Sequence, residues 1–181
     1  MKTFALYTSF VSVLFLSACK DKEVTPIGPI EGRFDIVNEQ GKVMTSFAKG
    51  QNVIFRFEVK NTTSEAVFLK NPLFDAQQFL ELYQLSSSTS NVLLGKPYNH
   101  IFCDYRGGFN IPARSTITLN ISWVEVANYS NSAIFCSHAA NSYLQPGRYK
   151  SSFAAAFTIL KPTGPETVLP AQSFSQEFDV R

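Results

Sequence analysis

The chain has few charged residues. Lys, Arg, Asp and Glu make up 17% of its 181 residues, below the quarter that is usual in globular proteins. Sixteen basic residues against fourteen acidic ones give a net charge of +2, and no segment carries a block of like charge. The sequence therefore excludes a protein that holds nucleic acid through a basic surface. Its 45% hydrophobic and 14% aromatic content also excludes a disordered chain, so one folded domain is expected.

The common catalytic motifs are missing as well. The sequence contains no Gly-x-Ser-x-Gly, no phosphate-binding glycine loop and no His-Glu-x-x-His. No cofactor is therefore expected, and a protein without catalysis is the favoured class. Two carboxylates that are distant in sequence can still meet in a fold as a glycosidase pair, so a hydrolase stays open as an alternative. The scattered candidates are Asp35, Asp75, Glu81, Asp104 and Glu125.

The N-terminus has the features of an export signal. Lys2 precedes an apolar run that ends at Leu16, and small residues follow, which is typical of a secretory signal peptide. The run is too short to span a bilayer. Leu16-Ser17-Ala18-Cys19 resembles the lipobox of bacterial lipoproteins. That resemblance implies cleavage after Ala18, removal of residues 1–18, and a diacylglycerol-modified, acylated Cys19 that anchors the protein in membrane lipid.

A linker is expected between the anchor and the folded part. Lys20–Glu23 resembles the charged export signals of surface lipoproteins in Bacteroidota, although a second Lys interrupts the acidic residues. The resemblance implies an outer-membrane lipoprotein at the cell surface; the alternative is a solvated tether on the periplasmic side. Val24–Gly32 is dense in Pro and Gly. Residues 19–32 are therefore predicted to be the lipidated Cys and a flexible linker, and residues 33–181 to be the domain.

The rest of the chain follows the two-residue period of β-strands. Apolar residues alternate with polar ones across Val53–Val59 and again across Ile117–Trp123, and we expect these two sets to be buried together. With no convincing helix, the pattern predicts an all-β fold, an immunoglobulin-like antiparallel β-sandwich of about eight strands, with a β-barrel as the alternative. The expected strands are 33–38, 43–47, 51–60, 66–69, 79–85 (resuming at 92–94), 116–124, 149–159 and 173–180.

Three segments resemble known β-sandwich modules. Gln51–Thr63 resembles the strand and Asn-Thr turn of many immunoglobulin-like domains. Ile111–Ser115, followed by Trp123, resembles the segment leading into the buried Trp strand of the BsuPI-like intracellular proteinase inhibitors, and Leu144–Tyr149 resembles a Pro-Gly-x-Tyr turn of the same family. The resemblance implies the sandwich fold and leaves a proteinase inhibitor as an alternative function. The inhibitory residues of the family have no counterparts that can be placed on this sequence.

Two cysteines remain once Cys19 is acylated. Because an exported protein resides where disulfides persist, Cys103 and Cys136 are predicted to form one. The alternative is a tetrahedral zinc site made by His100, Cys103, Cys136 and His138, although the spacing within each pair is unusual for zinc. Two unpaired thiols are the third possibility.

Aromatic residues in polar segments are the weak candidates for ligand contacts. Tyr98, Tyr105, Tyr129 and Tyr143 lie in or beside polar loops, where amphipathic rings often meet ligands. Trp123 shares a face with apolar neighbours and is expected in the core. The leading hypothesis is a non-catalytic, lipid-anchored module of the cell envelope that binds a protein or a glycan.

Overall fold

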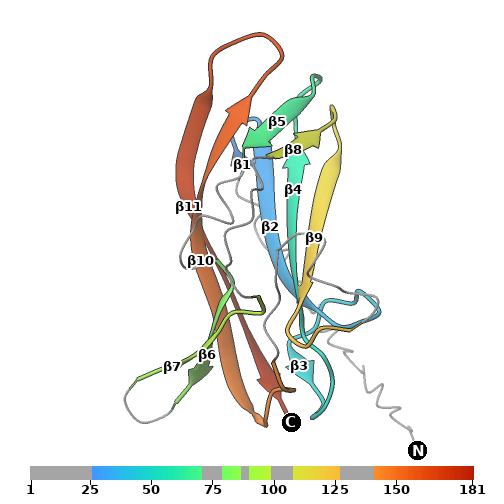
Figure 1. Ribbon diagram of the computed structural model, residues 1–181, viewed down its shortest axis with the longest axis vertical. Coiled ribbons are helices and arrows are strands. Elements are labelled where there is room, and N and C mark those ends of the chain that lie inside the picture. The colour runs from blue at the N-terminus through green and yellow to red at the C-terminus, as the bar shows by residue number, and fades with distance from the viewer. Residues whose placement is uncertain (1–25, 71–78, 87–89, 99–107, 127–140) are drawn as a thin grey trace, which may run out of the picture.

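The chain folds into two packed β-sheets. The computed structural model describes residues 26–70, 79–86, 90–98, 108–126 and 141–181, and these contain eleven strands. The four-stranded sheet has the order β1-β2-β4-β9, with β1 at Pro26–Ile27, β2 at Ile30–Val37, β4 at Ile54–Asn61 and β9 at Thr116–Ser122. Figure 1 shows this sheet beside the long strands of the second sheet.

The seven-stranded sheet is built around two 14-residue strands. Its order is β3-β11-β10-β5-β8, with β6 paired to β10 and β7 paired to β6. All pairs are antiparallel except β3 with β11. The strands are β3 at Ser46–Phe47, β5 at Val67–Lys70, β6 at Glu81–Leu85, β7 at Val92–Gly95, β8 at Gly108–Ile111, β10 at Gly147–Leu160 and β11 at Thr167–Val180.

This architecture confirms the expected all-β, immunoglobulin-like antiparallel β-sandwich. The barrel alternative is wrong, because the described strands divide into two separate sheets that pack face to face. Ala-rich Phe153–Phe157 is a strand rather than a helix, since its residues alternate between buried and exposed. Among the described residues, no helix is long and apolar enough to cross a membrane.

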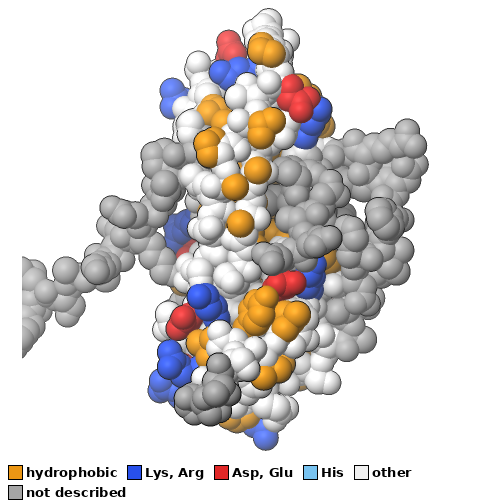
Figure 2. All heavy atoms as spheres, turned by 90° about the vertical axis from the view of Figure 1, so that its left-hand side faces the viewer, with side chains coloured by type: hydrophobic (Ala, Val, Ile, Leu, Met, Phe, Trp, Pro, Cys, Tyr) orange, Lys and Arg blue, Asp and Glu red, His pale blue; other side chains and the backbone are white. Residues whose placement is uncertain are grey.

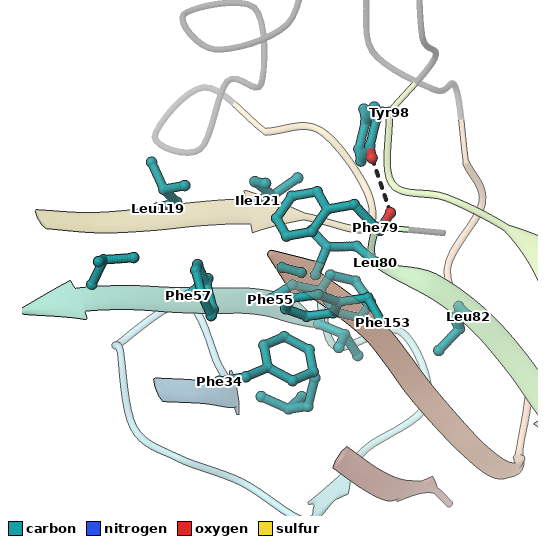
Figure 3. Packing of buried hydrophobic residues seen from close by; sticks show 14 of the residues in the cluster. Phe34, Phe55, Phe57, Phe79, Leu80, Leu82, Tyr98, Leu119, Ile121 and Phe153 are labelled. Atoms are coloured by element: carbon teal, nitrogen blue, oxygen red, sulfur yellow. Dashed lines mark hydrogen bonds between the residues drawn. The ribbon is translucent and has the colours of Figure 1, made fainter. Parts of the chain in front are cut away.

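The core is formed by the alternating faces that the sequence predicts. Phe57 of β4 pairs with Leu119 of β9, and Phe55 pairs with Ile121, so the two apolar sets lie side by side in one sheet. All four side chains are buried. Phe153 of β10 enters from the opposite sheet and lies 5.5 Å from the Phe57 ring, measured between ring centroids, in the packing that Figure 3 shows. Many of the Phe side chains of the sequence therefore pack in the space between the two sheets.

The ordered domain begins earlier than expected. The sequence predicts that residues 26–32 belong to the flexible linker, but Ile30 is fully buried and pairs with Asn61 at the end of β4. The backbone N–H of Thr62 also donates to the carbonyl of Pro29 at 2.9 Å. Pro and Gly here shape a tight connection, with Gly28 at a φ of +63°, instead of leaving the segment free. The linker prediction is therefore wrong for residues 26–32.

Candidate binding groove

Several predicted site residues lie outside the described residues. They are Cys19, His100, Cys103, Tyr105, Tyr129, Cys136 and His138. The lipid anchor, the disulfide and the alternative zinc site therefore stay predictions. Within the described part of the chain, no group of three or more His, Cys, Asp or Glu side chains could hold a metal ion.

Tyr98 is a structural residue and not a ligand contact. Its side chain is only 2% exposed, and its hydroxyl donates to the carbonyl of Phe79 at 2.9 Å, as the dashed line in Figure 3 shows. Burial raises the pKa of the Tyr98 phenol, with a further contribution from the negative charge of Glu81. The sequence-based interpretation was wrong because the surrounding polar residues suggested an exposed loop, whereas the ring packs against Phe79.

Of the other aromatic residues considered in the sequence, Tyr143 and Trp123 are described, and they differ in exposure. Tyr143 is 42% exposed, so it stays available for a contact. Trp123 is buried as expected, and its indole N–H donates to the carbonyl of Ser142 at 2.9 Å. Trp123 therefore belongs to the core.

The outer face of β6, β10 and β11 carries a row of polar side chains. Glu81 of β6 pairs with Ser152 of β10, and Ser152 pairs with Ser175 of β11. In the next outward-facing row, closer to the connection between β6 and β7, Tyr83 of β6 pairs with Lys150. Because successive side chains alternate across a strand, these residues point away from the core.

These side chains line an open groove of about 330 Å³, called here the outer groove. Its size is at the lower end of the range for ligand sites in proteins. The lining consists of Glu81, Tyr83, Lys150, Ser152, Phe153, Ala154, Ser173, Phe174 and Ser175. The groove therefore combines one carboxylate, one ammonium group, one phenol and three serine hydroxyls.

A hydrogen bond and a backbone turn fix the β6 side of the outer groove. The Tyr83 hydroxyl donates to the Oε2 atom of Glu81 at 2.7 Å. This hydrogen bond raises the pKa of Tyr83, and burial and the negative charge of Glu81 add to the shift. Immediately before β6, the fully buried Leu80 adopts a φ of +58°, which is uncommon for a residue other than Gly. The buried turn therefore sets the position at which Glu81 begins the strand.

An apolar hairpin lies beside the outer groove. In β7, three consecutive aliphatic side chains are exposed: Val92 at 54%, Leu93 at 51% and Leu94 at 39%. Consecutive residues point to opposite faces of a strand, so both faces of β7 meet solvent. The β6–β7 hairpin extends away from the sandwich in Figure 1, and Figure 2 shows hydrophobic side chains among charged ones on this side of the molecule. Such exposed apolar residues are typical of contact surfaces.

The outer groove could not be predicted from the sequence, because its walls come from segments that are far apart in the chain. Glu81 and Tyr83 alternate with Leu82, and this signal predicts one polar face of β6. Lys150 and Ser152 show the same alternation in β10. Nothing in the alternation shows that β6 pairs with this half of β10, which the fold alone establishes.

Comparisons with known proteins give only distant structural likenesses. No family model matches the chain, and no curated protein matches it in sequence. The ASH/PapD-like domain 7 of human CEP192 is similar at 12% identity over 96% of this chain and 98% of its own, with a TM-score of 0.39. A β-glucosidase from Listeria innocua in complex with gluconolactone is similar at 12% identity over 82% of this chain, with a TM-score of 0.27. The match covers 16% of the enzyme, and these values are too low to indicate a shared function.

Proposed function

We propose that this protein is a non-catalytic, lipid-anchored binding module of the cell envelope, and that the outer groove binds its ligand, a protein or a glycan. The observation that carries the proposal is the outer groove itself, in which polar groups from three strands converge beside an exposed apolar hairpin. A single carboxylate, Glu81, lines the described groove, whereas glycoside hydrolysis uses two. Binding is therefore a better match than hydrolysis.

The position of the anchor supports this proposal. Six residues, 20–25, separate Cys19 from β1. A fully extended segment of this length spans no more than about 22 Å. An acylated Cys19 would therefore keep the domain close to the bilayer, and the end at which the chain enters the sandwich would face the lipid.

The outer groove lies away from that end of the sandwich. Gly28, next to β1, lies against the side chain of Leu169, which pairs with Phe157 in the second half of β10. The pairing of β6 with β10 begins at Arg148 and ends at Ser152, in the first half of the strand. Figure 1 shows β1 and the β6–β7 hairpin toward opposite ends of the molecule. An anchored domain would thus present the outer groove away from the membrane.

The anchor is tested by Cys19→Ser. We expect wild-type protein in the outer-membrane fraction with a diacylglycerol-modified N-terminus detected by mass spectrometry, and Cys19→Ser in the soluble fraction or unprocessed. Unchanged membrane fractionation of Cys19→Ser would contradict the anchor. Protease treatment of intact cells separates the surface location, in which the domain is degraded, from the periplasmic one.

The binding surface is tested with paired variants of the full-length protein in its native envelope. Cross-linking of intact cells is compared for wild type, the double variant Tyr83→Ala/Lys150→Ala and the control Val168→Ala, which shortens an exposed side chain outside the groove. We expect the wild type and the control to capture the same envelope component and the double variant to lose it. Equal capture by all three would overturn the assignment of the outer groove.

A proteinase inhibitor remains the second function that the sequence resemblance suggests. Titration of the purified protein against serine and cysteine proteases decides it. Inhibition at micromolar protein concentration that survives Tyr83→Ala/Lys150→Ala would place the inhibitory residues away from the outer groove.

A further inference from the structure

We infer that the ligand of the outer groove is the neutral, polyhydroxylated chain of a short oligosaccharide. This inference rests on the proposed binding function and names its ligand class. It follows from the charge balance of the groove, from the donors and acceptors that line it, and from the state of the backbone beneath it.

The charges of the outer groove cancel. Glu81 and Lys150 are the only charged residues in its described lining, and they have opposite signs. Beyond the groove, toward the beginning of β10, the Arg148 guanidinium lies 3.4 Å from the Glu177 carboxylate and 3.8 Å from that of Asp179. These flanking charges are therefore already satisfied within the protein. A strongly anionic or cationic ligand would find no net charge to complement its own.

The remaining polar groups match hydroxylated ligands. Ser152, Ser173 and Ser175 line the groove, and each hydroxyl can both donate and accept a hydrogen bond. Ser173 and Ser175 are exposed. The second oxygen of the Glu81 carboxylate accepts hydrogen bonds, and the Lys150 ammonium donates them. A sugar chain carries the same alternation of donors and acceptors along its length.

Tyr83 supplies the apolar contact that a sugar ring needs. Its hydroxyl is held by Glu81 at 2.7 Å, so the ring is oriented before a ligand arrives. An oriented aromatic ring offers apolar area with little loss of conformational entropy on binding. From Lys150 to Ala154 the groove follows five residues of β10, and the four steps between them span about 13 Å, which suits a short oligosaccharide.

The backbone beneath the centre of the groove offers an extended peptide no strand edge. Extended peptides can bind by pairing with a free strand edge. Between Lys150 and Ser152, β10 already pairs with β6 on one side and with β11 on the other. The amide and carbonyl groups of this segment are therefore used within the sheet, and a ligand lying over it must be recognised by side chains.

The test is calorimetric titration of the full-length protein, solubilised in detergent, with neutral gluco-, xylo- and manno-oligosaccharides. An anionic oligogalacturonate and an uncharged extended peptide serve as the comparison ligands. We expect binding of at least one neutral oligosaccharide and no binding of the anionic one. Tyr83→Ala should weaken that binding by about tenfold, since it removes a central aromatic contact.

Two further variants separate the ring from its hydrogen bond. Tyr83→Phe keeps the ring but loses the bond to Glu81, so we expect binding to weaken by only about threefold. The control Val168→Ala, at an exposed residue outside the groove lining, should leave affinity unchanged. Preserved folding is checked for each variant by its circular dichroism spectrum and its thermal unfolding.

The failure of this inference differs from the failure of the proposed function. If no neutral oligosaccharide in the panel binds, or if the anionic one or the peptide binds equally well, the ligand class is overturned. In that case the cross-linking experiment decides the proposed function. If wild type captures an envelope protein and Tyr83→Ala/Lys150→Ala does not, the groove is a binding site whose ligand is a protein. If the double variant captures the same component as wild type, both proposals are overturned.

Discussion

At the scale of single residues, two buried asparagines hold β4 in place at its ends. Asn61 is fully buried at the end of the strand, and its side-chain amide donates to the carbonyls of Glu65 at 2.7 Å and Ile111 at 3.1 Å. Before the strand begins, Asn52 donates to the carbonyl of Val124 at 2.6 Å and accepts from the N–H of the same residue at 3.0 Å. Each amide satisfies backbone groups that the strand ladders leave unpaired.

Asn61→Asp tests this role directly. The substitution replaces an amide donor by a carboxylate that faces backbone carbonyls in a buried site, so we expect a loss of about 3–5 kcal/mol in the free energy of unfolding. Asn110→Asp, at an exposed position of β8, is the matched control and should change stability by less than about 0.5 kcal/mol. Urea unfolding measures both. Equal stability of the two variants would contradict the hydrogen bonds assigned to Asn61.

Phe57→Ala tests the centre of the core. The Phe57 ring lies 5.0 Å from the ring of Phe174 and 6.2 Å from that of Phe157, between ring centroids, and is 1% exposed. Its removal should cost about 3–5 kcal/mol of unfolding free energy, because the lost contacts leave a cavity between the sheets. Val168→Ala, at a residue that is 66% exposed, should cost less than about 0.5 kcal/mol. A loss below about 1 kcal/mol for Phe57→Ala would be incompatible with this packing.

At the scale of strands, β10 and β7 differ strongly in how many neighbouring strands they pair with. Over 14 residues, β10 pairs with β11 on one side and with β6 and then β5 on the other. In the described part of the chain, β7 pairs only with β6, through a ladder that contains an irregularity between Leu82 and Tyr83. Strands with few buried contacts open at a lower free energy than central strands.

Hydrogen–deuterium exchange should report this difference. Amides of β7 are expected to exchange at least about tenfold faster than those of Phe153–Phe157 in β10, because β7 is exposed on both faces. Mass spectrometry of peptides covering each strand measures the two rates. Similar protection of both strands would show that β7 is covered, and would contradict its description as an exposed hairpin.

The strands divide clearly into those that the sequence could predict and those that it could not. Alternation predicted β4, β9, β10 and the part of β11 from Ser173 onward, because each has runs of the two-residue period with one more buried face. The first residues of β11, from Thr167, were missed because they are mostly exposed and do not alternate. Gly108–Ile111 was missed, since four residues that begin with Gly give no periodic signal. The outer groove was missed for another reason: the order of strands within a sheet depends on packing between distant segments, which local alternation does not encode.

At the scale of the whole molecule, residues on the flanks of the segments that carry Cys103 and Cys136 lie close together in the fold. The side-chain amide of Asn141 donates to the carbonyl of Lys96 at 3.2 Å and to that of Trp123 at 3.1 Å. Cys103 follows Lys96 by seven residues, and Cys136 precedes Asn141 by five. The described residues thus place Lys96 and Asn141, which flank the two cysteine segments in sequence, next to each other, and the disulfide itself stays a prediction.

The disulfide between Cys103 and Cys136 is therefore expected to stabilise the sandwich as a whole. It would close a loop of about 33 residues, for which the chain-entropy model gives about 3–5 kcal/mol of unfolding free energy. Non-reducing peptide mapping of protein purified from its native envelope should recover the two cysteines in one linked peptide pair. Reductant should lower the stability of the wild type but not of the double variant Cys103→Ser/Cys136→Ser. Two free thiols, or stoichiometric zinc that a chelator removes, would contradict the disulfide, and the second result would favour the alternative site with His100 and His138.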